Sequence, residues 1–355
     1  MKNQTNQIWA LLQENGVVQG EQPEKGVSES PWYVRVLLAF SGWLAAIFIL
    51  GFIGAAFEFV FRHSGVAGIV GVMMIAGAFV LLRIPSNEFV EHLGLATSMA
   101  GQALIVYAIF DLSDHNEIVA WLLFAILQAT LVAFMPNFVH RVFSALVAAI
   151  AFSMALNEMK IPYVISGLVM FGASCCWLNE FRYPQQMKKI RAIGYGLVLA
   201  LIALKGTTLL GYKTFGKRFS QNHDFWAQAW LGEIIIGAVT VYIVWSLLQR
   251  YGQPMKGRMS ITTLLATLLV CAVSINVQGI TVGMVIVCFG FLGANRVLLG
   301  LGIVSLLFYI SSYYYLLDTT LLGKSQSLLV VGLFLLFVRW IIHNIIPAHN
   351  EVQHA

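Results

Sequence analysis

Charged residues are scarce in this sequence. Only 10% of its 355 residues are charged, with 21 Lys or Arg and 16 Asp or Glu, whereas about 25% is usual in a soluble domain. Lys, Glu, Arg and Asp supply most of the exterior of a soluble globule, so this few cannot cover a soluble protein of this length. A soluble enzyme is therefore excluded, as are a disordered and a collagen-like chain.

Cysteine is also scarce, and its four residues match no disulfide or zinc pattern. Cys175 and Cys176 are adjacent, Cys271 and Cys288 lie in separate apolar runs, and no C-x-x-C is present. Within lipid a cysteine is usually a small apolar filler. No serine–histidine–aspartate, paired-carboxylate or haem-ligand arrangement stands out either. We therefore expect no catalytic residues, no metal site and no cofactor, and an enzyme is the less favoured class.

Apolar residues make up 59% of the chain. A bilayer core of about 30 Å needs about 20 apolar residues as a helix, which satisfies its own backbone polar groups. The sequence thus predicts an all-α fold, a polytopic integral membrane helix bundle of about twelve transmembrane helices. The predicted spans are 34–57, 64–82, 88–110, 117–135, 139–157, 161–179, 191–210, 226–248, 260–276, 279–294, 297–317 and 325–346.

The spans form a single transmembrane domain over 34–346, between a polar amino-terminal segment (1–33) and a short tail (347–355). Because a basic stretch followed closely by an apolar run is missing at the start, the first span is expected to act as an uncleaved anchor. Within 260–294 the short segment Asn276-Val277-Gln278 marks the break between the ninth and tenth spans, which form either a tight hairpin or one interrupted helix.

Lys and Arg in short loops favour the cytoplasmic side of a membrane. If the amino terminus is inside, fourteen of these residues are cytoplasmic and seven are outside. The cytoplasmic set is Lys2, Lys25, Arg35, Arg83, Arg141, Arg182, Lys188, Lys189, Arg191, Arg250, Lys256, Arg258, Arg296 and Arg339. The outer set is Arg62, Lys160, Lys205, Lys213, Lys217, Arg218 and Lys324. The bias predicts two cytoplasmic termini, although four of the outer residues lie in or beside the basic, aromatic loop 206–225.

A faint internal repeat is a further hypothesis. Arg83, Arg191 and Arg296 lie 108 and 105 residues apart, and each precedes a span that opens with glycine. This spacing predicts three units of four helices. The alternative is that arginine at helix ends and glycine in helices are common in membrane proteins anyway.

Among the charged residues inside predicted spans, where ionisable groups are costly and often functional, Glu233 and Lys205 are the leading candidates. Glu233 shares a helical stripe with Trp226, Trp230 and Gly237. Lys205, near the outer end of the preceding span, reaches a similar depth if its side chain snorkels. We expect these two residues to form an ion pair in the outer leaflet. The alternative is that Lys205 points to the headgroups and a protonated Glu233 points into the bundle.

Three weaker candidates lie toward the carboxyl end. Asp318 and Lys324 flank the turn before the last span and are expected to pair, beside a belt formed by Tyr313, Tyr314 and Tyr315, and Arg296 opens the eleventh span. Near the third span, Glu88, Glu91 and His92 share one helix face with metal-ligand spacing. Acidic residues in a first helical turn are also favoured by the helix dipole, which is the preferred interpretation here.

Both ends of the chain resemble one family. The opening motifs are Trp9…Leu12, Gly16-Val17-Val18-Gln19-Gly20-Glu21 with Pro23, Pro31-Trp32-Tyr33-Val34-Arg35, and Ser41-Gly42-Trp43-Leu44-Ala45-Ala46. The carboxyl-terminal motif runs from Tyr313-Tyr314-Tyr315-Leu316 through Thr320-Leu321-Leu322-Gly323-Lys324-Ser325. They are similar to a bacterial multi-spanning membrane family, domain of unknown function 4401 (DUF4401). The resemblance implies a partner, a small membrane-anchored protein with a Gly-Asp-Tyr-x-x-Leu-x-Tyr (GDYxxLxY) signature, and no established activity.

The apolar runs and the family resemblance together imply an integral protein of the bacterial inner membrane. It is expected to be non-enzymatic, to act with a partner membrane protein, and to contact the lipid bilayer but no nucleic acid. The alternative is a secondary transporter or lipid-handling protein that uses Glu233 and Lys205 within the membrane. A water-filled cavity at Glu233 would favour transport, and a polar face near Tyr313–Lys324 would favour the partner.

Overall fold

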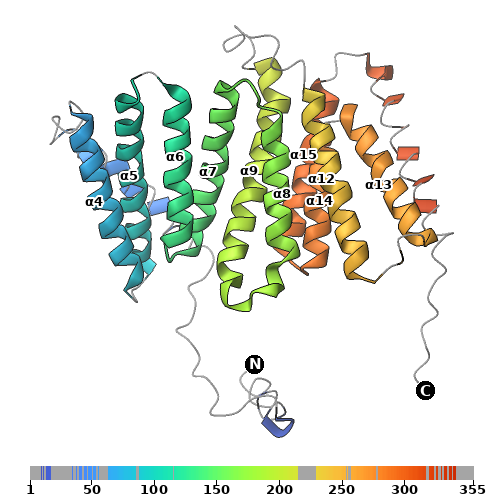
Figure 1. The fold of residues 1–355 in the computed structure, drawn as a ribbon, viewed down its shortest axis with the longest axis horizontal. Coiled ribbons are helices and arrows are strands. Elements are labelled where there is room, and N and C mark those ends of the chain that lie inside the picture. The colour runs from blue at the N-terminus through green and yellow to red at the C-terminus, as the bar shows by residue number, and fades with distance from the viewer. Residues whose placement is uncertain are drawn as a thin grey trace.

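The computed structural model describes residues 63–84, 88–114, 116–214, 229–252, 254, 257–276, 279–316 and scattered positions outside these ranges. Within them the chain forms α-helices and two short 3-10 helices, and no strand occurs in this part of the chain. The helices stand side by side and roughly parallel to one axis (Figure 1). The expected all-α bundle is therefore present.

The helices follow the predicted spans in order. They are α4 (Ser64–Arg83), α5 (Glu88–Leu112), α6 (Glu117–Phe134), α7 (Phe138–Glu158), α8 (Val164–Leu178), α9 (Met187–Thr214), α12 (Ala229–Arg250), α13 (Arg258–Asn276), α14 (Ile280–Leu292) and α15 (Arg296–Leu316), with η1 (Glu180–Arg182) and η2 (Pro184–Gln186) before α9. Half of the first predicted span and most of the twelfth lie outside the described residues, as do the tail and most of the amino-terminal segment.

Short turns make neighbouring helices antiparallel. Asn116 and Asn137 begin α6 and α7 by accepting backbone N–H bonds from Val119 and His140, as is usual for an N-cap. Asp114 and Lys160 adopt left-handed backbone conformations in the turns after α5 and α7, where a helix commonly ends. Alternation places the ends of α4, α6, α8, α12 and α14 together with the starts of α5, α7, α9, α13 and α15, which we call the basic end because it holds Arg83, Arg141, Arg182, Lys188, Lys189, Arg191, Arg250, Arg258 and Arg296.

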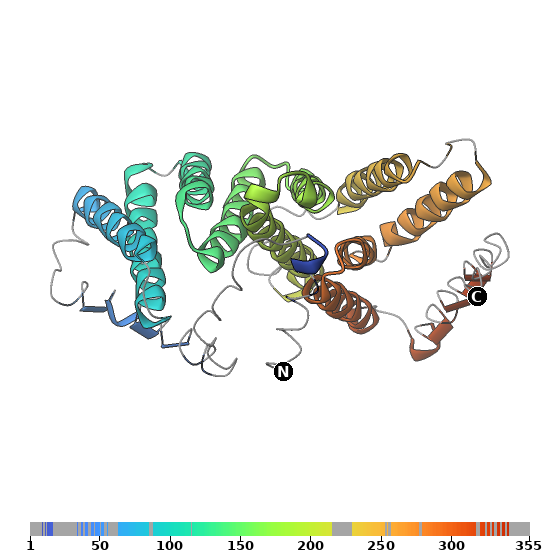
Figure 2. The same cartoon turned by 90° about the horizontal axis from the view of Figure 1, so that it is seen from below.

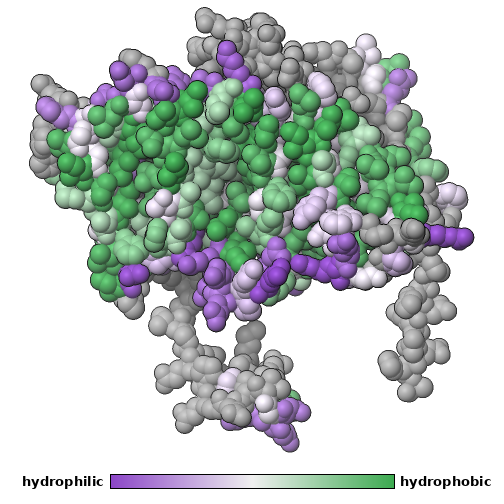
Figure 3. Space-filling view, viewed as in Figure 1, coloured by the Kyte–Doolittle hydropathy of each residue, from purple (hydrophilic) through white to green (hydrophobic). Residues whose placement is uncertain are grey.

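The distribution of apolar and polar residues on the surface is typical of a membrane protein. Apolar side chains form a broad band across the helices, and hydrophilic residues gather along its two edges (Figure 3). Six helices in the described ranges are long and apolar enough to cross a bilayer, namely Ser64–Arg83, Val90–Leu112, Glu117–Phe134, Phe138–Glu158, Pro184–Thr208 and Trp230–Arg250. The expected count of about twelve crossings is thus supported only as far as these six helices. Shorter helices such as α14, with 13 residues, reach about 20 Å at 1.5 Å per residue, less than the bilayer core.

The main core lies in the second half of the described bundle. Buried apolar residues from α7, α8, α9, α12, α14 and α15 form one cluster, with Trp177, Ile236 and Tyr309 among its large side chains. In the view along the helices, α9, α14 and α15 lie behind the row formed by α8, α12 and α13 (Figure 2). A smaller cluster, Ala67, Leu104 and Ala108, joins α4 to α5.

Glycines allow several of these helices to approach closely, as packing in lipid requires. A Cβ atom on Gly71 would lie 2.6 Å from the Gly101 carbonyl oxygen of α5, and one on Gly290 would lie 2.6 Å from the Leu299 backbone nitrogen of α15. Gly71 and Gly290 are therefore points of close helix packing. Gly77 is not, because a Cβ there would meet nothing within 4 Å.

The region 260–294 forms two helices and not one interrupted helix. The backbone N–H of Thr281 donates to Ser274 Oγ at 3.4 Å. In a continuous helix residues seven apart are separated by about 10 Å along the axis, so the chain must reverse between α13 and α14. Gly279 precedes α14 with φ +93°, which is a left-handed conformation that glycine adopts without strain.

Candidate functional site

Lys205 and Glu233 meet in the interior of the bundle. Lys205 lies near the end of α9 and Glu233 near the start of α12, so both are close to the end of the bundle opposite the basic end. Lys205 Nζ donates to Glu233 Oε1 at 2.7 Å. The two residues are 3% and 2% exposed. The predicted ion pair is present, and it is removed from solvent and from the lipid-facing surface.

The α13–α14 turn contacts the other side of the Glu233 carboxylate. Ser274, near the end of α13, donates to Glu233 Oε2 at 3.4 Å, and accepts the bond from the Thr281 N–H. Thr281 is only 2% exposed, yet its hydroxyl has no hydrogen-bond partner among the described residues. Unpartnered buried polar atoms are rare in folded proteins. This turn therefore leaves spare hydrogen-bonding capacity beside the ion pair.

Tyr309 of α15 closes the site from the side of the α14 start. A Cβ on Gly279 would lie 2.8 Å from the Tyr309 ring, so only glycine lets the turn approach the ring so closely. The Tyr309 hydroxyl donates to the Ile202 carbonyl of α9 at 3.3 Å, one turn before Lys205. Residues from α9, α12, α13, α14 and α15 thus converge, and we call Lys205, Glu233, Ser274, Thr281 and Tyr309 the ion-pair site.

A second group of buried polar side chains connects α5, α6 and α7. His140 is fully buried, with Nε2 2.7 Å from Ser98 Oγ and Nδ1 3.2 Å from Ser144 Oγ. Gln102 lies 3.2 Å from His140 Nε2 and accepts a bond from Gln128 Nε2 at 2.9 Å. We call these five residues the His140 network. Its side chains come from three helices and supply polar contacts between them.

The sequence analysis missed the His140 network and three members of the ion-pair site. Ser274, Thr281 and Tyr309 are polar residues that occur singly in apolar runs, where Ser and Thr commonly bond within their own helix. The available signal was His140 together with two glutamines in predicted spans, since amides and histidines in lipid usually pair across helices.

The remaining predicted residues have mixed outcomes. Arg296 is the exposed first residue of α15. Asp318 and Lys324 lie outside the described residues, so their expected pairing stays a prediction. Glu91 accepts a hydrogen bond from the Asn137 side chain, and Arg191 pairs with buried Glu180 near the basic end.

The prediction of a basic loop over 206–225 is wrong for residues 206–214. α9 continues as a helix through Thr214, and residues 215–225 lie outside the described residues. The hydroxyls of Thr207 and Thr208 donate to the Leu204 carbonyl at 2.9 and 2.8 Å, which is compatible with a helical backbone. The segment also contains no proline that would end the helix.

Metal-binding side chains do not cluster in the part of the chain that the structure describes. No group of three or more His, Cys, Asp or Glu residues there is arranged to hold an ion. The four cysteines are free, and Cys175 and Cys288 are exposed. The described residues thus offer hydrogen-bonding and charged groups, and it is the ion-pair site that concentrates them.

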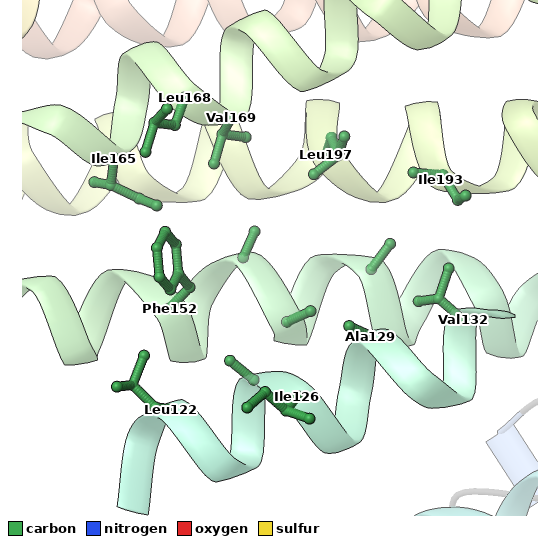
Figure 4. Close-up of a pocket in the computed structure, with 14 residues that line it drawn as sticks. Leu122, Ile126, Ala129, Val132, Phe152, Ile165, Leu168, Val169, Ile193 and Leu197 are labelled. Carbon is green, nitrogen blue, oxygen red and sulfur yellow. The ribbon is translucent and has the colours of Figure 1, made fainter. Parts of the chain in front are cut away.

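A cavity of about 470 Å³ lies between α6, α7, α8 and α9. Its lining is apolar, including Leu122, Ile126, Phe152, Ile165 and Leu197, and these side chains face one another across the space (Figure 4). Neither Lys205 nor Glu233 lines it. The cavity therefore suits an acyl chain and gives no polar ligand a charge or hydrogen bond.

Comparison with known proteins identifies a family. No curated protein and no solved structure matches the chain. A family model described as a domain of unknown function, DUF4401, matches residues 31–344, which is nearly the whole chain. The resemblance carried by the motifs at its two ends is thereby confirmed, and this apolar helix bundle belongs to the DUF4401 family.

Proposed function

We propose that this protein is a non-enzymatic secondary transporter whose translocation site is the ion-pair site. The observation that carries the proposal is the buried contact between Lys205 and Glu233 at 2.7 Å, beside the turn that joins α13 to α14. Transport is the alternative function expected from the sequence, and it is the buried ion pair that supports it, since the described cavity does not reach Glu233.

The energetic cost of the pair favours a role beyond structure. Removing two charges from water costs several kcal/mol per ion, and well-packed apolar residues of similar volume are often as stable as a buried pair. Helices in lipid pack adequately through small residues, which this bundle has at Gly71 and Gly290. Ionisable residues inside membrane bundles typically mark the pathways of ions and substrates.

The turn between α13 and α14 lies against the ion pair. α13 ends at Asn276 and α14 begins at Ile280, and Ser274 and Thr281 on either side of the turn are joined to Glu233 through hydrogen bonds. Helix ends that face a buried charge can offer their free backbone groups to a ligand.

The proposed setting is the bacterial inner membrane, with about twelve crossings and two cytoplasmic termini. The alternation of the described helices and the concentration of basic residues at one end support this orientation. An even number of crossings would return both termini to that side.

Solute-driven proton or sodium flux tests the proposal. The purified full chain is reconstituted into liposomes that contain a pH- or sodium-sensitive dye, under an imposed potential. Amino acids, organic acids, amines and sugars are then added as separate pools. We expect at least one pool to drive flux in wild type, and Glu233→Gln to reduce that flux at least about tenfold, since the carboxylate charge is lost.

Glu117→Gln is the matched control, because Glu117 is an exposed carboxylate at the start of α6. It should leave the flux unchanged. Equal flux in wild type and Glu233→Gln, or no flux above empty liposomes for any pool, would remove transport through this site.

A further inference from the structure

We propose that the ion-pair site binds a zwitterion, with an ammonium group on Glu233 and a carboxylate or phosphate group on Lys205. The inference rests on the proposed transport function and names its substrate class. The closed pair is neutral overall, and each of its two residues is at most 3% exposed.

Charge balance restricts what can open the pair. A ligand that separates Nζ of Lys205 from Oε1 of Glu233 must replace both partners, since one buried charge left without a counter-charge is strongly unfavourable. An anion alone would leave Glu233 uncompensated, and a cation alone would leave Lys205 uncompensated. A molecule that carries both charges a few ångströms apart satisfies both residues and keeps the site neutral.

The α13–α14 turn supplies groups for the anionic half of such a ligand. The start of α14 presents backbone N–H groups, and helix N-termini favour anions. The Thr281 hydroxyl is buried and has no partner within the described ranges, so it can donate a further hydrogen bond. Lys205 provides the opposite charge. Because residue 279 is a glycine, the turn can lie directly against the Tyr309 ring.

The Glu233 carboxylate, on which the α13–α14 turn also lies, suits the cationic half. Among the described residues Glu233 Oε2 makes a long contact of 3.4 Å with Ser274 Oγ, whereas Oε1 holds Lys205 at 2.7 Å. A carboxylate offers about four acceptor positions, so an ammonium group can be accepted without dismantling the Ser274 contact. Small amino acids and the headgroup of phosphatidylethanolamine share this chemistry.

Thermal unfolding of the full chain in detergent tests the ligand class. Alanine, N-acetylalanine and alanine methyl ester supply a zwitterion, an anion and a cation on nearly the same frame, and phosphatidylethanolamine in the micelle is compared with phosphatidylglycerol. We expect the melting temperature to rise with the logarithm of zwitterion concentration. A response to alanine alone identifies a soluble amino acid, and a response to phosphatidylethanolamine alone identifies a lipid headgroup.

Two variants locate the effect. Lys205→Met combined with Glu233→Gln keeps the site neutral and should abolish the response. Thr281→Val keeps the shape of the side chain and should weaken apparent affinity at least about tenfold, the equivalent of one hydrogen bond to a charged group. Lys189→Met with Glu158→Gln, both at exposed positions, should leave the response intact.

The inference is overturned if N-acetylalanine or the methyl ester stabilises the protein as well as alanine does. It is also overturned if no zwitterion stabilises it, or if the response survives in the double variant. Flux that depends on Glu233 but not on zwitterions would overturn only the ligand class, whereas flux indifferent to Glu233→Gln would overturn the transport function itself.

Discussion

At the scale of single residues, Lys205 and Glu233 depend on each other. Glu233→Ala or Lys205→Met alone leaves one buried charge without its partner, and we expect each to lower the free energy of unfolding by about 3–5 kcal/mol. The combined Lys205→Met and Glu233→Gln variant leaves no charge and should recover most of that loss. Denaturant unfolding in mixed micelles measures all of these variants.

The recovery in the double variant is the decisive comparison. If the double variant loses as much unfolding free energy as the two single variants lose together, the residues act independently. The contact at 2.7 Å then contributes no coupling energy.

His140 is the residue on which the second polar group depends. Its imidazole contacts the side chains of Ser98, Gln102 and Ser144. His140→Ala should destabilise the protein by about 1–3 kcal/mol, because buried polar groups lose their partner. The change in thermal unfolding is compared with that of His63→Ala, an exposed residue just before α4. Equal melting temperatures for the two variants would show that the network adds no stability.

The sequence reveals some of these residues and conceals others. Glu233 and Lys205 are visible because a charge inside an apolar run is exceptional. Gln102, Gln128 and His140 lie in separate runs, and only the packing of α5, α6 and α7 brings them together. Thr281 was hidden because its significance comes from a missing partner, which no sequence pattern records.

At the scale of helices, α4 and α5 form a hairpin that depends on close backbone approach. Gly71→Ala would place a methyl group 2.6 Å from the Gly101 carbonyl oxygen and 2.7 Å from Ile105 Cγ1. We expect a loss of about 1–3 kcal/mol from the resulting overpacking, measured by denaturant unfolding in micelles. Gly77→Ala, six residues along the same helix, meets nothing within 4 Å and should be neutral or slightly stabilising. The opposite ranking would mean that the two helices do not touch at Gly71.

Helix order was predictable, whereas helix ends were less so. Ten described α-helices follow ten predicted spans, because each apolar run is long enough to be recognised on its own. The predicted span 191–210 ends four residues before the end of α9 at Thr214, because the apolar run gives way there to Tyr212 and Lys213. A helix can continue past the end of an apolar run, since its backbone hydrogen bonds do not depend on apolar side chains.

At the scale of the whole molecule, the alternation of helices predicts which turns face the same compartment. Single cysteines at Asp114 and Lys160, in a cysteine-free background, should react with an impermeant maleimide added outside intact cells. Cysteines at Ile84 and Asn179, which follow α4 and α8 at the basic end, should react only after permeabilisation. Labelling of all four cysteines from the same side would contradict the alternation of helices on which the proposed orientation rests.

A partner protein is the second prediction for the whole molecule. The family resemblance implies a small membrane-anchored protein with the GDYxxLxY signature, and contact near Tyr313–Lys324 is expected. In the described part of that segment, the Tyr315 side chain is 79% exposed and contacts the Tyr314 ring. Co-expression and purification in mild detergent should recover the two proteins together, and Tyr315→Ala should reduce recovery at least several-fold. Trp340→Ala, also exposed, is the control. Separate elution from wild type would exclude a stable complex.

The order of the two charges along the chain has a consequence for biogenesis. Lys205 precedes Glu233 by 28 residues, so α9 emerges from the ribosome before its counter-charge does. Until α12 arrives, a lysine near the end of α9 must remain at the interface, because its insertion alone is unfavourable. Burial of Lys205 against Glu233 is therefore expected only after α9 and α12 have packed together.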